Sequence, residues 1–159
     1  VGMPARHTLK QRVVVGATAH ILMGIFVNTT KYSVRQLRPD GSTRNSFPSG
    51  HTAFVFTGVE MLYQEYKDTD LWVGITGYTV ATAVGLSRIY NNRHWASDVV
   101  AGAGVGILST KIAYLLLPYI YKEKPHKNPQ ERSTLGSFWA VPTYDPWQNS
   151  LGVSVNFSF

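Results

Sequence analysis

Three separated clusters of polar residues have the types and spacing that suit phosphoryl chemistry. In chain order they are Lys31 with Arg38-Pro39, then Pro48-Ser49-Gly50-His51, then Ser87-Arg88 followed by His94 and Asp98. Together they offer three cations, two imidazoles and a carboxylate that can orient one of the imidazoles. This set of groups predicts a phosphoryl transfer that passes through a phosphohistidine.

The first cluster is predicted to present two cations on one helix face. Lys31 and Arg38 lie seven residues apart, so a helix over residues 29–38 would place them two turns apart on the same side. Pro39 predicts the end of that helix, because proline disfavours the α conformation in the residue before it. An Arg and a Lys together match the oxygens of a phosphoryl group. Taken alone, a basic helix end is more often a solvated charge that complements the helix dipole.

The second cluster precedes a mostly apolar run and is predicted to place an anion at a helix N-terminus. Residues 53–62 predict a helix from about Thr52 onward. Free backbone N–H groups favour an anion there, Gly50 lets the backbone come close, and Ser49 adds a hydroxyl donor. His51, in the first turn, is placed to protonate a leaving-group oxygen. By itself the tetrapeptide could equally be a plain Ser N-cap after a proline turn.

The third cluster pairs a histidine with an acid. His94 and Asp98 are one helical turn apart, so the carboxylate can accept from one ring nitrogen and leave the other nitrogen free to attack. Arg88, which precedes a predicted polar loop over residues 90–93, supplies the third cation. A His-Asp pair on a helix is also common without any catalytic role. The cluster therefore becomes specific only beside the other two.

Taken in order, the three clusters resemble the signature of the type 2 phosphatidic acid phosphatase (PAP2) superfamily. The pattern is Lys-x6-Arg-Pro, Pro-Ser-Gly-His and Ser-Arg-x5-His-x3-Asp, and it covers about residues 29–108. This superfamily includes bacterial acid phosphatases, lipid phosphatases and vanadium haloperoxidases. The resemblance implies that His94 is the nucleophile, Asp98 its orienting partner and His51 the general acid. It also implies a phosphate clamp made of Lys31, Arg38, Ser49, Gly50 and Arg88.

These residues predict a metal-independent phosphatase that acts on phosphomonoesters or pyrophosphates, lipid phosphates above all, and needs no cofactor. Two alternatives remain open. A vanadium-dependent haloperoxidase would use the same site, although haloperoxidases of this superfamily are usually much longer chains. A non-catalytic module that binds phosphate or a lipid head group would need the cations and the helix N-terminus, but neither His51 nor His94.

Composition narrows the class of protein. The 159 residues fit one catalytic domain, and 44% hydrophobic residues suffice for a core. The absence of cysteine excludes a disulfide framework, a thiolate metal site and a cysteine nucleophile. His7, His20 and His126 have no partners at ligand spacing, so no metal site is predicted. The net charge of +6 suits an anionic substrate or membrane surface, but the basic residues form no nucleic-acid-binding motif.

Hydrophobic periodicity predicts an all-α fold, a bundle of about five helices with a short C-terminal β-hairpin or extended tail. The predicted helices cover residues 9–28, 29–38, 52–66, 71–86 and 95–121. The predicted domains are a PAP2-like catalytic bundle over 1–121, a polar linker over 122–136 and a C-terminal extended segment or hairpin over 137–159. Short strands are expected at residues 137–141 and 151–159.

Whether the bundle crosses a membrane depends on helix length, because a span needs about 20 predominantly apolar residues. The apolar stretch over 13–27 is shorter and contains His20, whereas the stretch over 99–121 is long enough but carries Lys111. A mean hydropathy of −0.08 is low for a polytopic membrane protein. The balance therefore favours a soluble or membrane-surface bundle over short spanning helices.

The chain is expected to act in the bacterial cell envelope, in the periplasm or at a membrane surface. It begins at Val1 without the features of a signal peptide, as a mature or trimmed form would. Arg35, Arg44 and Arg93 are candidates to draw it toward anionic lipid. The expected partner is a phosphorylated lipid or small phosphoester, and a homo-oligomer is compatible with the sequence.

Overall fold

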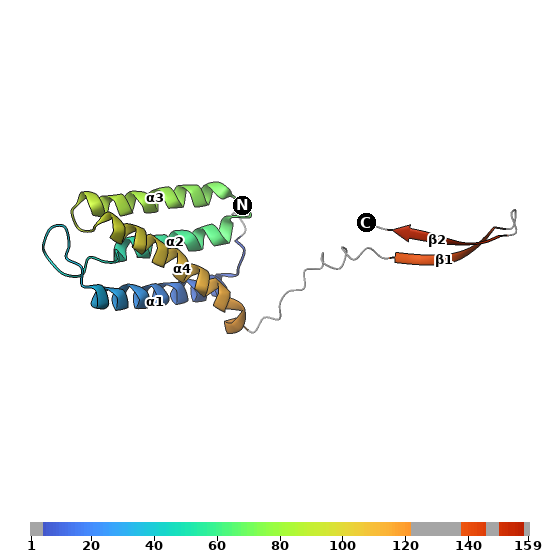
Figure 1. The fold of residues 1–159 in the computed structure, drawn as a ribbon, viewed down its shortest axis with the longest axis horizontal. Coiled ribbons are helices and arrows are strands. Elements are labelled where there is room, and N and C mark those ends of the chain that lie inside the picture. Colours follow the sequence, from blue (N-terminus) through green and yellow to red (C-terminus); the bar gives the residue numbers. More distant parts are fainter. Residues whose placement is uncertain (1–4, 122–137, 146–149, 158–159) are drawn as a thin grey trace. The chain divides into compact units, whose positions relative to one another are not determined.

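Four helices form the part of the described chain that carries the predicted site. The computed structural model describes residues 5–121, 138–145 and 150–157. The helices are α1 Leu9–Val34, α2 Gly50–Tyr66, α3 Leu71–Tyr90 and α4 Ala96–Tyr121. They alternate in direction, so the α1–α2 and α3–α4 connections lie at the same end of the bundle (Figure 1).

One continuous helix, α1, replaces the two helices predicted over residues 9–38. The polar residues around the predicted boundary are helical, and their side chains bond to the preceding turn: Asn28 Nδ2 donates to the Gly24 carbonyl at 2.8 Å, and Thr30 Oγ1 to the Phe26 carbonyl at 2.8 Å. The helix ends at Arg35, which takes the left-handed conformation with φ 48°. The prediction that Lys31 and Arg38 share a helix face is therefore wrong.

The other three helices agree with their predicted ranges apart from their ends. α3 continues to Tyr90, which places Arg88 in its last turn rather than beside a loop. α2 begins at Gly50, directly after its N-cap Ser49. The fold is all-α, as predicted, with four helices in the described residues instead of five.

Small residues let α2 and α4 pack closely. A Cβ placed on Gly102 would lie 2.5 Å from the Ser49 carbonyl oxygen, and one on Gly106 would lie 2.5 Å from the Ala53 carbonyl oxygen. Glycines four residues apart on one helix face allow backbones to approach in this way. α4 is consequently pressed against the first turns of α2, where the predicted anion site lies.

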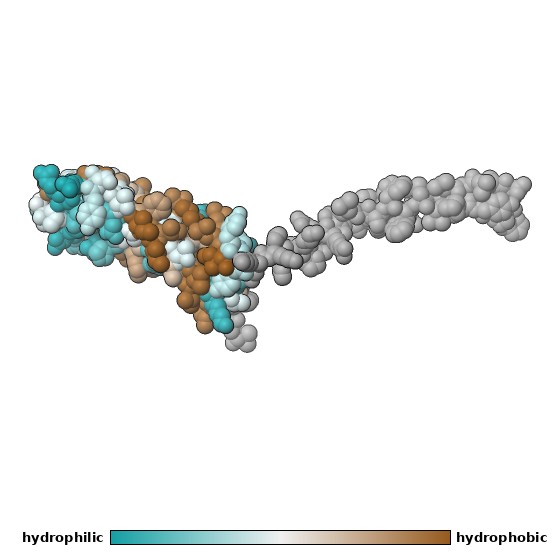
Figure 2. Space-filling view, turned by 90° about the horizontal axis from the view of Figure 1, so that it is seen from below, coloured by the Kyte–Doolittle hydropathy of each residue, from teal (hydrophilic) through white to brown (hydrophobic). Residues whose placement is uncertain are grey.

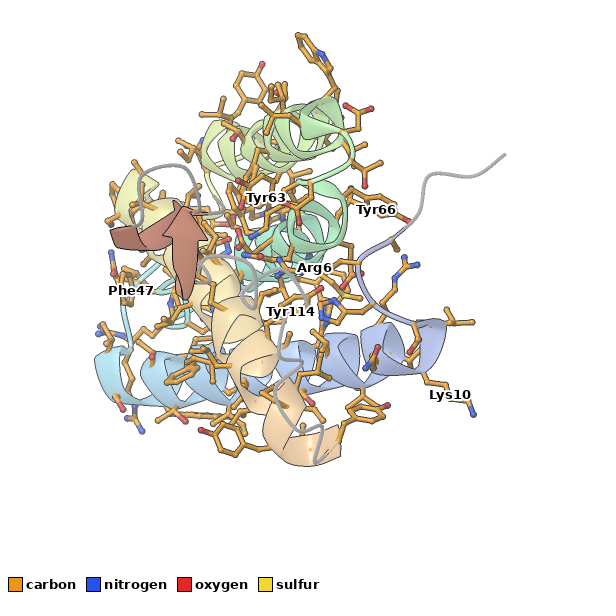
Figure 3. All side chains as sticks on the ribbon, turned by 90° about the vertical axis from the view of Figure 1, so that its right-hand side faces the viewer. Arg6, Lys10, Phe47, Tyr63, Tyr66 and Tyr114 are labelled. Carbon is orange, nitrogen blue, oxygen red and sulfur yellow. The ribbon has the colours of Figure 1, made fainter. Side chains whose placement is uncertain are left out.

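The segment before α1 is fixed to the opposite end of the bundle. The carboxylate of Glu65, nearly fully buried, accepts from the His7 backbone N–H at 3.0 Å and from the Tyr114 hydroxyl at 2.6 Å. The Arg6 backbone N–H donates to the Glu65 carbonyl at 3.1 Å. Figure 3 looks onto this end and labels Arg6, Tyr66 and Tyr114 there. This network sets where α1 starts relative to α2 and α4.

Much of the outer surface of the helices is apolar. α1 and α4 are both long and apolar enough to cross a membrane by length and composition, and only 22% and 28% of their most apolar stretches is buried. Figure 2 shows hydrophobic side chains gathered over the helices and hydrophilic ones at the end that carries the loops. The prediction that the first apolar helix is too short to span is wrong, because α1 has 26 residues.

The chain divides into two compact units, Val1–Lys122 and Glu123–Phe159. In the second unit, β1 Phe138–Asp145 and β2 Ser150–Phe157 pair as antiparallel strands, with Phe138 opposite Phe157 and Asp145 opposite Ser150. The predicted linker over 122–136 lies outside the described residues, and the predicted domain boundaries stay a prediction.

The close approach of α4 to α2 is expected to depend on Gly106. In Gly106→Ala the added methyl would meet backbone atoms that cannot move aside, so we expect a loss of about 1–3 kcal/mol in the free energy of unfolding. The matched control is Gly104→Ala, where a Cβ meets nothing within 4 Å and helix propensity should give a gain of about 0.5–1 kcal/mol. Unfolding in detergent, followed by circular dichroism, measures both. Equal stability of the two variants would contradict the packing argument.

Candidate active site

A cavity of about 480 Å³ lies between α1, α2 and the connections at the loop end of the bundle. Its lining includes five of the eight predicted site residues: Lys31, Arg38, Gly50, His51 and His94. Apolar side chains of α1, α2 and α3 complete the wall, among them Val27, Phe54 and Val84. The three sequence clusters therefore meet in space, although they come from different helices and loops.

Asn45 holds the two cations of the first cluster. The Lys31 ammonium donates to the Asn45 backbone carbonyl at 2.6 Å, and Arg38 Nε donates to the Asn45 side-chain oxygen at 3.1 Å. Arg38 lies in the loop after α1, and this loop turns back so that its guanidinium group faces the same cavity as Lys31. The pairing of the two charges thus depends on the loop and not on helical spacing.

The N-terminus of α2 forms another wall, as the second cluster predicts. Ser49 is the N-cap, and its hydroxyl oxygen accepts from the Thr52 hydroxyl at 2.9 Å. Ser49 is fully buried and does not line the cavity, whereas Gly50 and His51 in the first turn do. His51 is exposed, so solvent and a substrate can both reach its ring.

His94 is 3% exposed and lies just before α4, not within it. Its Nδ1 is 3.5 Å from Asp98 Oδ2, which pairs the two residues as predicted but without an aligned hydrogen bond. Asp98 Oδ2 accepts instead from the Ser46 hydroxyl and from the Trp95 backbone N–H at 2.9 Å. Because Nδ1 is on the Asp98 side of the ring, Nε2 is the nitrogen left for the cavity.

Two buried polar atoms at this pair have no hydrogen-bond partner in the described residues, His94 Nδ1 and Asp98 Oδ1. A small rotation that brings them together would satisfy both, and positive charge on the imidazole would favour that pairing. The geometry is thus suited to an imidazole that becomes cationic during a reaction.

Arg88 does not line the cavity, and its backbone holds the turn before His94. Its backbone carbonyl accepts from the backbone N–H groups of Arg93 at 3.0 Å and His94 at 3.3 Å, which fixes the turn that carries His94. Arg88 Nε is buried without a partner in the part of the chain that the structure describes. An anion deep in the site would give this donor an acceptor.

The surroundings of His94 lower its pKa below the usual value for histidine. Burial contributes most because it disfavours the charged ring, and the nearby Lys31 and Arg38 charges lower the pKa further. The Ser46 backbone and Asp98 act in the opposite direction and only partly offset these effects. The ring is therefore held neutral at neutral pH, which is the form that can attack an electrophile.

Sequence reasoning did not identify Asn45, Ser46 and Trp95, which position the predicted groups. The indole of Trp95 donates to the Leu37 carbonyl at 2.9 Å, and Ser46 reaches Asp98 from the loop before α2. Trp95 directly follows His94, and Asn45 and Ser46 lie two to three residues before Pro48, but their types occur in many surface loops. Only the folded arrangement shows what they hold.

The arrangement can bind a phosphoryl group and transfer it. It joins a neutral buried histidine, an exposed histidine, two cations and a helix N-terminus around one cavity. Among the described residues, no group of three or more His, Asp or Glu side chains is placed to hold a metal ion. The fold and the cavity together define a helical bundle with a phosphate site at one end.

The chain belongs to the PAP2 superfamily, whose family model matches residues 12–122. The crystal structure of Aquifex aeolicus LpxE superposes with a TM-score of 0.61 at 28% identity, covering 67% of this chain and 69% of that one. The shared fold therefore extends over most of the helical unit.

Curated relatives act on lipid phosphates according to their names. Lipid A 1-phosphatase of Porphyromonas gingivalis is 48% identical over 111 residues, which are 70% of this chain and 25% of the relative. Undecaprenyl-diphosphatase of Sulfolobus acidocaldarius is 34% identical over 102 residues, which are 57% of this chain and 46% of the relative. The chain thus spans a quarter to a half of the length of these two relatives.

The low pKa of His94 is expected to depend in part on Lys31. Lys31→Met removes a charge that disfavours the imidazolium, so the pKa of His94 should rise but stay below its usual value, because burial remains. Lys10→Met, on the same helix at the far end of the bundle, should leave the titration unchanged. NMR of labelled imidazole measures the midpoint directly. The acidic limb of kcat/KM should move to higher pH in Lys31→Met, since only neutral His94 attacks; identical midpoints in both variants would contradict this account.

Proposed function

We propose that this chain is the catalytic core of a metal-independent lipid phosphate phosphatase that works through a phosphohistidine at His94. The observation that carries the proposal is the position of His94: buried, held neutral, beside Asp98, and in the wall of a cavity that also contains Lys31 and His51. Membership of the PAP2 superfamily supports the same roles.

In the first step His94 Nε2 attacks phosphorus in line with the leaving oxygen. The N–P bond forms as the P–O bond breaks, and His51 gives a proton to the departing oxygen. Lys31, Arg38 and Gly50 stabilise charge on the equatorial oxygens from the cavity wall. Arg88 and Ser49, which lie outside that lining, would complete the clamp for a phosphoryl group that enters more deeply. Asp98 stabilises the imidazole as it becomes cationic.

In the second step water hydrolyses the phosphohistidine. His51, now neutral, takes a proton from the water, the P–N bond breaks, and the electron pair returns to His94. Inorganic phosphate then leaves through the open side of the cavity. The exposure of His51 supports this dual role, because water must reach it in the second half of the reaction.

The substrate we propose is an amphipathic phosphate or pyrophosphate in a bacterial membrane, with the 1-phosphate of a lipid A-type glycolipid as the leading candidate. The 48% identity to a lipid A 1-phosphatase supports this choice. So do α1 and α4, whose apolar stretches are mostly exposed, unlike the core helices of a soluble bundle. Arg35 and Arg44, both exposed near the loop end, suit an anionic surface. Arg93 is instead paired with Asp40 at 3.0 Å.

A substrate panel tests the class of reaction. We expect hydrolysis of an aryl phosphate and of a lipid phosphate in mixed micelles to survive EDTA and to be blocked by vanadate, which mimics five-coordinate phosphorus. The lipid should have the higher kcat/KM. Activity that EDTA abolishes and added metal restores would overturn the mechanism. Bromide oxidation by peroxide with vanadate, without phosphatase activity, would indicate a haloperoxidase, and phosphate binding without either activity would indicate a binding module.

Substitutions of the two histidines are expected to impair different steps of the reaction. His94→Ala should abolish turnover and leave no covalent species, because no nucleophile remains. His51→Ala should slow formation of the phosphoenzyme by about 10² to 10⁴, with a smaller defect for a leaving group that needs no proton. Rapid-quench labelling with ³²P-substrate measures both. His7→Ala, remote from the cavity, is the control; labelled phosphate in His94→Ala would show that the nucleophile is another residue.

A further inference from the structure

A second cavity, of about 570 Å³, runs along α1 and α2 beside the candidate active site. Its lining includes Leu9, Val13, Ala17 and His20 from α1 and Phe54 and Met61 from α2, and we name it the α1–α2 groove. His20 Nδ1 lies 2.8 Å from the Gly16 carbonyl oxygen, so this nitrogen has a hydrogen-bond partner on its own helix. The groove therefore presents a mainly apolar surface.

The α1–α2 groove adjoins the active-site cavity. Phe54 lines both, and its ring packs edge-on against His20 with centroids 4.8 Å apart. Helical periodicity places Gly24 on the same face of α1 as Ala17 and Lys31. Gly24 lies along α1 between the residues that line the two cavities, and a Cβ there would meet nothing within 4 Å, so no neighbouring side chain fills the space beside it.

The geometry of in-line attack predicts which side of the phosphoryl group faces the groove. The leaving oxygen must be opposite His94 and within reach of His51, the proposed general acid. Phe54 is three residues after His51 on α2 and shares its face. A group attached to a leaving oxygen beside His51 would therefore lie near Phe54, which also lines the groove.

We infer that the α1–α2 groove holds a hydrocarbon chain of the substrate's leaving group. The inference rests on the proposed function, and the shared Phe54 wall and the open position at Gly24 carry it. From Leu9 to Gly24 the groove face of α1 rises about 22 Å, which is long enough for most of an extended acyl chain. The walls offer an alkyl chain apolar contact and no charge that it would have to desolvate, apart from Arg12 at the far end.

The test uses n-alkyl phosphates from ethyl to decyl phosphate, each below its critical micelle concentration, with the full chain in detergent. We expect kcat/KM to rise by up to about fourfold for each methylene that the groove buries. Phenyl phosphate, which has no chain, serves as the reference substrate. A kcat/KM that is independent of chain length would overturn the inference.

Two substitutions block the groove without touching the proposed clamp. Gly24→Leu fills the open position between the cavities, and Ala17→Trp fills the exposed middle of the groove. Gly24→Leu should remove most of the gain with chain length and Ala17→Trp the gain from the longest chains only, while phenyl phosphate turnover is unchanged. Gly24→Ala is the matched control, because it makes a similar change in helix propensity and leaves the passage open. Wild-type chain dependence in both blocking variants, or an equal loss with phenyl phosphate, would contradict the assignment.

A binding measurement separates this inference from the phosphatase proposal. A decyl phosphonate with a diazirine at the end of its chain should photolabel the groove face of α1 between Ala17 and Gly24, and Gly24→Leu should abolish the label. If no ester is hydrolysed, the proposed function fails, but this labelling still decides the occupant of the groove. A label on another surface, or on a second copy of the chain, would assign the groove to a different occupant.

Discussion

Asp98 joins the loop before α2, the start of α2 and the segment that leads into α4. Its backbone carbonyl accepts from the Ser49 N–H at 2.9 Å, its Oδ2 accepts from Ser46 and Trp95, and its carboxylate lies beside His94. A fully buried carboxylate is costly unless nearby donors satisfy it, so the loop before α2 and the first turn of α4 are held to it. Asp98, through its carboxylate and its backbone carbonyl, thus positions both the proposed nucleophile and the N-terminus of α2.

The helices meet through small residues and carry their large apolar residues outward. Three of the seven buried residues in the two core clusters are alanines, Ala19, Ala53 and Ala113, while large apolar residues such as Val13, Ile21 and Leu115 are more than half exposed. A soluble bundle gains stability by burying its large side chains, whereas helices in lipid gain from close backbone contact and lose nothing by exposing Leu or Ile. Gly102 and Gly106 provide that contact and at the same time press α4 onto the start of α2. The packing that suits a membrane is therefore also the packing that assembles the site.

The sequence predicted which residues meet around the cavity better than it predicted what holds them in place. Lys31, His51 and His94 line one cavity, as the types and order of the clusters predicted, and three of the four helices followed from apolar periodicity. The end of α1 could not be predicted, because side chains such as Asn28 and Thr30 can either break a helix or bond back to it, and tertiary context decides which. The role of Asn45 depends on a loop conformation that leaves no periodic signal. The same limit applies to Arg88, whose position follows from the extra turn of α3.

Polar groups are distributed along the bundle in a way that suits the proposed chemistry. One end carries the loop network of Lys31 and Asn45, and the other carries the buried Glu65 with its donors. Between them, Glu60 is 2% exposed and satisfied by the Gln64 amide at 2.7 Å and the Tyr78 hydroxyl, so the apolar middle contains a carboxylate that is compensated internally. α1 rises about 39 Å over its length, more than the roughly 30 Å of a bilayer's hydrocarbon. With the bundle spanning lipid, the cavity would lie at the boundary. Attack on a lipid phosphate needs an apolar neighbour for the chain, hydrolysis of the phosphohistidine needs water, and only a site at that boundary has both.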